Sequence, residues 1–224
     1  ANDDAAIWLY SAEQGVSYPR TRPDETRPFR YADAIRLRGA HNLANVQAAT
    51  LAAELLGVPE PTIRSGVASF GGAPHRLEVV RVLDDVTWVN DSASTAPVAG
   101  VAALRSFDEP IVLIAGGNTK RLDHSEWAEQ ASARAKRIIL LKGSATEAFA
   151  ADLRAAAARR GKPDPIEGIY DDFAAAIQRA RELAAPGDVV LLSPGFTSFG
   201  LFLHEFDRGD QFRALVQALP ESPR

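Results

Sequence analysis

The sequence predicts an α/β fold built on a doubly wound, mostly parallel sheet with helices on both faces. From Leu77 onward, short apolar runs alternate with runs of helical periodicity, as expected for strands joined by helical crossovers. Two of the apolar runs, Ile111–Ala115 and Val189–Leu192, show no alternation of polar and apolar residues. Such runs are typical of central strands that are buried on both sides.

The strands and helices of this part can be placed in order. Strand-like runs lie at Leu77–Leu83, Val86–Val89, Ile111–Ala115, Arg137–Leu141, Ile166–Tyr170 and Val189–Leu192. Between them we expect one helix over Pro97–Ser106, one that a capping box at Ser144–Glu147 opens, and one that starts at Asp171.

Residues 1–76 are predicted to be a separate piece of the chain. A helix is expected over His41–Leu56, and its many apolar residues indicate that it is largely buried. A second, short helix is expected over Pro61–Phe70. Gly71–Pro74 then interrupts the pattern, so we place a domain boundary between residues 1–76 and 77–224.

The strand at Val86–Val89 ends in the polar turn Asn90–Thr95, and a helix begins at Pro97. In open α/β sheets, ligands bind in the crevice beyond the carboxyl ends of the strands. Asp91 and Thr95 are therefore candidate binding residues. The alternative is that they are ordinary turn and N-cap residues.

Two further polar loops, Gly116–Lys120 and Ser193–Ser198, follow central strands. In a parallel sheet these loops emerge at the same edge as Asp91, and together they offer an ammonium group, hydroxyls and backbone N–H groups. Such groups suit an anionic ligand, although neither loop has the P-loop pattern, and a solvated surface lysine is the alternative for Lys120. Further along, charges on the surface of a helix are expected at Glu205, Asp207 and Arg208.

His75 and Arg76 lie at the predicted boundary. The planar fork of Arg76 is suited to phosphate, with a salt bridge across the hinge as the alternative, and His75 is expected to be structural. His124 and His204 have no partners at metal-ligand spacing, so no protein metal site is expected.

Asn42 and Asn45 are three residues apart, on one face of the first turn of the helix His41–Leu56. A carboxamide offers both a donor and an acceptor, which suits the edge of an adenine. The alternative is an N-cap together with an amide that bonds to the backbone.

Bulk properties exclude several classes of protein. The net charge of -4 argues against nucleic-acid binding through a basic surface. The sequence has no apolar run of membrane-spanning length, no signal peptide and no cysteine, so we expect a cytoplasmic protein that binds no membrane. It also has no methionine, even at position 1, and we expect it to be a fragment of a longer protein.

Taken together, the motifs resemble the Mur ligases of peptidoglycan synthesis, and most closely their glutamate-adding branch. The similar segments, which run in the family's order from about Leu37 to the end, are Gly39–Asn45, Pro74-His75-Arg76, Asn90-Asp91-Ser92-x-x-Thr95, Gly116-Gly117-x-x-Lys120, Leu192-Ser193-Pro194-x-x-x-Ser198 and Arg208-Gly209. The resemblance implies that residues 1–76 are the last part of a central ATPase domain. It also implies that residues 77–224 form a Rossmann-like, glutamate-binding domain.

The activity that this resemblance implies is ATP-dependent addition of D-glutamate to UDP-N-acetylmuramoyl-L-alanine through an acyl phosphate. The expected ligands are ATP, Mg²⁺, glutamate and the UDP-muramoyl precursor, and the protein is expected to be a monomer. The family's P-loop, Mg²⁺-binding residues and carbamylated lysine would lie upstream. We therefore expect no catalytic residue within this fragment, and no activity from it alone.

The resemblance also implies roles for individual residues. ATP would be bound by Asn42 and Asn45 at the adenine, Arg76 at the phosphates and Asp91 at the ribose. Glutamate would be bound through one carboxylate by Thr95 and Lys120, and through the other by Ser198 and the backbone N–H near Glu205.

One position departs from the family's pattern. The turn usually reads Asp-Ser-Lys-Ala-Thr, whereas here Ala93 replaces the lysine. Because a cation is lost there, three other readings stay open: an L-glutamate-adding ligase, a polyglutamate-type ligase, and a non-catalytic nucleotide-binding module.

Overall fold

The computed structural model describes residues 8–11 and 13–221. The chain forms two compact units, and the division along the sequence falls between Gly72 and Ala73. The predicted division, after Arg76, lies four residues further along the chain. Each unit is described by itself.

The first unit combines a small sheet with two helices. Its strands β1 (Trp8–Ser11), β2 (Val16–Pro19) and β3 (Arg27–Pro28) pair antiparallel in that order. A 3-10 turn η1 (Ala32–Ala34) and helices α1 (Ala40–Leu55) and α2 (Glu60–Ser69) follow, close to the predicted helices.

The expectation that this first helix is largely buried is wrong. Within α1 only Gln47, Thr50 and Leu51 are buried. The reason is that few elements of this unit pack against α1: in the part that the structure describes, it contacts chiefly α2 and β1, and Gln47 also bonds to the Val16 carbonyl of β2. Apolar residues such as Leu55 therefore stay 45% exposed.

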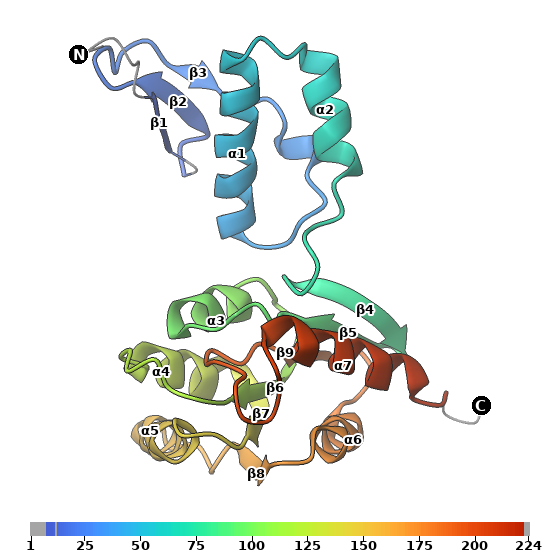
Figure 1. Ribbon diagram of the computed structural model, residues 1–224. Coiled ribbons are helices and arrows are strands. Elements are labelled where there is room, and N and C mark those ends of the chain that lie inside the picture. The colour runs from blue at the N-terminus through green and yellow to red at the C-terminus, as the bar shows by residue number, and fades with distance from the viewer. Residues whose placement is uncertain (1–7, 12, 222–224) are drawn as a thin grey trace. The chain divides into compact units, whose positions relative to one another are not determined.

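The second unit is a three-layer α/β domain, as predicted (Figure 1). Its six-stranded sheet has the order β4-β5-β9-β6-β7-β8, in which β4 is antiparallel to β5 and all other neighbours are parallel. The strands are β4 (Glu78–Leu83), β5 (Val86–Asn90), β6 (Ile111–Gly116), β7 (Ala135–Leu141), β8 (Ile166–Tyr170) and β9 (Val189–Leu192).

Helices cover both faces of this sheet (Figure 1). One face carries α3 (Pro97–Leu104), α4 (Ser125–Arg134) and α5 (Thr146–Arg159), and the other carries α6 (Phe173–Leu183) and α7 (Glu205–Ala218). Each face has its own apolar core, one around Trp127 and Phe149 and the other around Trp88 and Phe212. Because β6 and β9 lie between the two cores, every residue of both strands is buried, which confirms the interpretation of their uninterrupted apolar runs.

The predicted capping box at Ser144–Glu147 is wrong. Helix α5 begins at Thr146, and its N-cap residue, Ala145, makes no side-chain cap hydrogen bond. The Ser144 hydroxyl instead accepts a hydrogen bond from the Thr119 N–H, 3.2 Å away in the loop after β6. A contact between two loops thus replaces the local cap. By contrast, Asp172 caps α6 by accepting from the N–H groups of Ala174 and Ala175.

Candidate functional site

The carboxyl ends of the central strands are level with one another. In the parallel register, Asn90 of β5 lies opposite Leu192 of β9, which also lies opposite Ile114 of β6. The polar loops after these strands therefore start side by side. Two links hold the loops after β5 and β9 together: the Gly195 N–H donates to the Ser94 carbonyl, and the Ser193 hydroxyl donates to the Asp91 carboxylate, 2.8 Å away.

Lys120 and Thr95 meet at this edge, as the resemblance requires. The Lys120 ammonium donates to the Thr95 hydroxyl across 3.0 Å, and the lysine side chain is exposed. Both residues line a small surface pocket whose wall also includes Phe196. A cation and a hydroxyl that reach solvent together can bind one carboxylate through charge-assisted hydrogen bonds.

Ser198, in the loop after β9, and the start of α7 offer further polar groups. Ser198 is only 4% exposed, and its hydroxyl has no hydrogen-bond partner among the described residues. Glu205 is the first residue of α7, where backbone N–H groups lack intrahelical acceptors, and the His204 ring accepts from the Asp207 N–H one turn on. An unpaired hydroxyl and a helix N-terminus both favour an anion.

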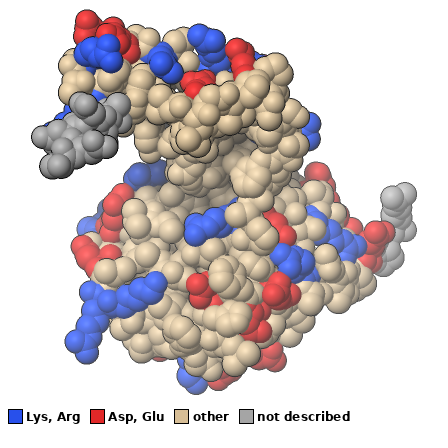
Figure 2. Space-filling model, turned by 45° about the horizontal axis from the view of Figure 1, so that its top comes forward, with Lys and Arg blue, Asp and Glu red and all other residues tan. Residues whose placement is uncertain are grey.

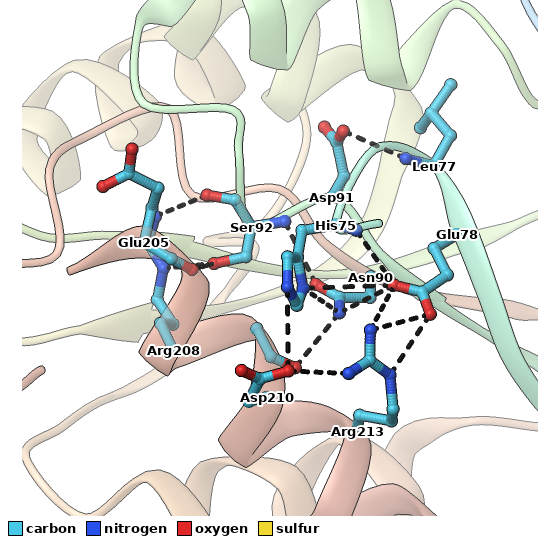
Figure 3. Close-up of polar contacts among 11 residues, drawn as sticks. His75, Leu77, Glu78, Asn90, Asp91, Ser92, Glu205, Arg208, Asp210 and Arg213 are labelled. Carbon is cyan, nitrogen blue, oxygen red and sulfur yellow. Dashed lines mark hydrogen bonds and ion pairs between the residues drawn. The ribbon is translucent and has the colours of Figure 1, made fainter. Parts of the chain in front are cut away.

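Asp91 is almost completely buried. Its residue is 7% exposed, and one carboxylate oxygen accepts from the Leu77 N–H at 3.2 Å (Figure 3). The other oxygen accepts from the Ser193 hydroxyl at 2.8 Å. Burial raises the pKa of Asp91 to about 7, against the opposing effects of these hydrogen bonds and of the nearby Arg76 charge. Arg76 itself is exposed.

The two asparagines lie in the first unit, at the start of α1. The Asn42 carboxamide donates to the Arg38 carbonyl at 2.7 Å, which is the local backbone bond considered as the alternative to adenine binding. Asn45 is exposed one turn further along the helix. Their role toward a nucleotide stays a prediction.

The prediction that Arg208 is a surface charge is wrong. The residue is fully buried, and its guanidinium donates at 2.8 Å to both the hydroxyl and the carbonyl of Ser92 (Figure 3). A third, longer bond reaches the Phe196 carbonyl in the loop after β9. Burial lowers the pKa of Arg208 to about 9, opposed by the charges of Glu205 and Asp91.

His75 belongs to a buried polar cluster that joins the start of this unit to β5 and α7 (Figure 3). The Asn90 carboxamide donates to the His75 Nδ1, 3.0 Å away, and to the Gly209 carbonyl at 3.1 Å. The Glu78 carboxylate accepts from the His75 N–H, and both of its oxygens accept from the Arg213 guanidinium. A Cβ on Gly209 would lie 2.1 Å from the His75 ring, so the glycine that follows Arg208 permits this packing.

Basic and acidic side chains are interspersed on the face of the molecule that Figure 2 shows. Within residues 8–11 and 13–221, no three His, Cys, Asp or Glu side chains are grouped so as to hold a metal ion. Among the helices that the structure describes, none has both the length and the apolar character needed to cross a membrane.

Comparison with known families identifies the same region. The model of the family described as "Mur ligase, glutamate ligase domain" matches residues 75–196, which is more than half of the chain. The matched span contains Arg76, Asp91, Thr95 and Lys120 and ends just before Ser198.

Curated relatives extend the similarity over most of the chain. A UDP-N-acetylmuramoylalanine--D-glutamate ligase of Roseiflexus sp. (strain RS-1) is 49% identical over 189 residues, which is 83% of this chain and 39% of that protein. The enzyme of the same name from Symbiobacterium thermophilum is 43% identical over 192 residues, 86% of this chain and 41% of that protein. The chain thus spans about two fifths of the length of these relatives.

Solved structures share the fold at low identity. The folylpolyglutamate synthase of Mycobacterium tuberculosis, complexed with ADP, has a TM-score of 0.61 and 18% identity, and the match covers 93% of this chain and 46% of that one. The UDP-N-acetylmuramate-alanine ligase MurC of Thermotoga maritima has a TM-score of 0.60 and 14% identity, covering 95% and 45%.

Proposed function

The chain belongs to the Mur ligase family through its glutamate ligase domain, and from this premise we propose that it is part of an ATP-dependent ligase of peptidoglycan synthesis. The reaction would join D-glutamate to UDP-N-acetylmuramoyl-L-alanine, the substrates in the name shared by the relatives from Roseiflexus and Symbiobacterium. Residues 1–76 would be the last part of the ATP-binding domain, and residues 77–224 would bind the glutamate.

The observation that supports this proposal most is the meeting of Lys120 and Thr95 at the edge of the sheet where the Ser198 loop also begins. Lys120, hydrogen-bonded to Thr95, would bind one carboxylate of the amino acid. The unpartnered Ser198 hydroxyl and the backbone N–H of Glu205 would bind the other. Two separated carboxylate sites suit a dicarboxylic amino acid and leave its amino group free to react.

In the proposed reaction, the γ-phosphoryl group of ATP is transferred to the carboxylate of the UDP-linked substrate, giving an acyl phosphate and ADP. The amino group of glutamate attacks the acyl carbon, phosphate leaves, and the amine gives up a proton as the amide forms. The contribution of this chain would be to hold that amine in line, because positioning a nucleophile lowers the barrier to attack.

We propose roles toward ATP for residues of each unit by itself. Asn42 and Asn45 would contact adenine, Arg76 the phosphates and Asp91 the ribose. Mg²⁺ would accompany the phosphates. Since the described residues group no acidic side chains for a metal, we assign this chain no step that involves the ion.

Phosphate release by the full-length polypeptide tests the proposal. The assay supplies ATP, Mg²⁺ and UDP-N-acetylmuramoyl-L-alanine, with D-glutamate, L-glutamate or no amino acid. Release that depends on D-glutamate, with a matching amount of amide product, is the expected result. Release that depends on L-glutamate alone would identify L-glutamate as the substrate instead. No release in any tube would favour a non-catalytic nucleotide-binding module.

A further inference from the structure

Asn118, in the loop after β6, contacts two other loops through one side chain. Its Oδ1 accepts from the Ser144 N–H, 2.6 Å away in the loop after β7. Its Nδ2 donates to the Phe199 carbonyl in the loop after β9. One partner is a donor and the other an acceptor, so a carboxamide satisfies both, whereas a carboxylate of the same shape satisfies only the first.

The backbone of Asn118 reinforces the second of these contacts. Its N–H donates to the Thr197 carbonyl, and its carbonyl accepts from the Thr197 N–H, both at 3.0 Å. The Thr197 hydroxyl also donates to the Asn118 carbonyl at 3.1 Å. Both neighbours of Ser198 along the chain, Thr197 and Phe199, are therefore bound to Asn118.

The backbones of the loops approach each other closely here. A Cβ on Gly117, whose φ is +138°, would lie 2.3 Å from the Thr197 carbonyl oxygen. A Cβ on Gly143 would lie 2.3 Å from the Gly117 carbonyl oxygen. Backbone packs directly on backbone, so the hydrogen bonds of Asn118 fix where the loops after β6, β7 and β9 lie.

We propose that Asn118 is a positioning residue that sets the separation between Lys120 and Ser198, and thereby selects the amino acid by the distance between its two carboxylates. Lys120 lies two residues after Asn118, and Ser198 lies between its two bonded partners. This inference rests on the proposed function. An amino acid that is one methylene shorter, such as aspartate, would span only one of the two positions.

The test is steady-state kinetics of the full-length polypeptide with the acidic amino acid varied. Asn118→Asp retains the acceptor for Ser144 but sets a carboxylate against the Phe199 carbonyl, so the side-chain link to Phe199 is replaced by repulsion next to Ser198. The KM for glutamate should rise roughly tenfold or more, and the preference for glutamate over aspartate in kcat/KM should fall by a similar factor. The KM for ATP should stay unchanged.

Two further variants make the test decisive. Asp123→Asn is the matched control, since it exchanges acid for amide later in the same loop, leaves the Asn118 contacts in place, and should behave as wild type. Asn118→Gln keeps the donor and acceptor on a longer arm, so it should shift the glutamate-to-aspartate preference even if Asn118→Asp does not fold. Thermal unfolding identifies the folded variants.

The outcomes separate this inference from the proposed function. If wild type uses glutamate but folded Asn118 variants keep its KM and its preference over aspartate, Asn118 is not a positioning residue. A fall in kcat that is equal for the two amino acids overturns the inference in the same way. If wild type depends on no acidic amino acid, the proposed function fails, and the inference fails with it.

Discussion

The Lys120 ammonium donates a hydrogen bond to the Thr95 hydroxyl across 3.0 Å, although the two residues belong to loops that follow different strands. The parallel register of β5, β9 and β6 brings those loops to one edge of the sheet. The pair is accessible to solvent, and an exposed cation with a hydroxyl beside it can take up a carboxylate.

Lys120→Met should weaken glutamate binding specifically. Loss of a charge-assisted hydrogen bond costs about 1.5–3 kcal/mol, which corresponds to a rise of roughly tenfold to a hundredfold in the KM for glutamate. The KM for ATP should not change, as measured by initial rates with each substrate varied. Lys142→Met, at an exposed lysine paired with Asp171, is the control. An equal rise in both KM values would remove Lys120 from the amino-acid site.

Ser198→Ala should separate function from stability. The Ser198 hydroxyl is buried and has no partner in the part of the chain that the structure describes, so its removal should leave the free energy of unfolding unchanged or slightly higher. The KM for glutamate should nevertheless rise by up to about tenfold, the worth of one hydrogen bond. Urea unfolding and steady-state kinetics on the same preparations check both parts. A less stable variant with an unchanged KM would make Ser198 a structural residue.

Asp91→Asn should alter how stability depends on pH. Burial raises the pKa of Asp91 from 3.8 in its ordinary range to about 7. The folded state therefore holds the proton more tightly than the unfolded state. The stability that protonated Asp91 contributes is fully present below pH 3.8 and is lost as the pH rises through about 7.

Asparagine does not titrate, so the variant should gain stability relative to wild type by at most about 3 kcal/mol between about pH 5 and pH 8. Urea-induced unfolding at several pH values measures the difference. Asp108→Asn, at an exposed residue of the same unit, should follow wild type throughout. Parallel curves for wild type and Asp91→Asn would contradict this account of Asp91.

Arg208→Met should destabilise the second unit by about 2–4 kcal/mol. Methionine fills a similar volume but leaves the carbonyls of Ser92 and Phe196 without their donor. Arg105→Met removes an exposed arginine paired with Glu126 and should cost about 1 kcal/mol or less. The free energies of unfolding in urea make the comparison. Equal losses in the two variants would show that the bonds of Arg208 contribute little.

The fold of the second unit was predictable because each strand can be recognised from its own short stretch of sequence. Uninterrupted apolar runs at Ile111–Ala115 and Val189–Leu192 predict buried central strands, and parallel strands place the following loops at one edge. The same reasoning predicts that Thr95 and Lys120 lie at the same edge of the sheet. The candidate role of Ser198 comes from the family motif alone, since no periodicity identifies it as a binding residue.

Two of the errors concern contacts between segments that are distant in sequence. Ser144 has the spacing of a capping residue, but its hydroxyl is bound by Thr119 from another loop. Arg208 lies among charged residues on a helix, yet it is fully buried because Ser92 accepts its hydrogen bonds. The links that Asn118 makes to two other loops depend likewise on tertiary placement.

A crystal structure of the full-length polypeptide with D-glutamate bound would show the amino-acid site itself. One carboxylate is expected against the Lys120 ammonium and the Thr95 hydroxyl, and the other against the Ser198 hydroxyl and the Glu205 N–H. Glutamate bound elsewhere, or bound here with a carboxylate that touches neither pair, would contradict that expectation.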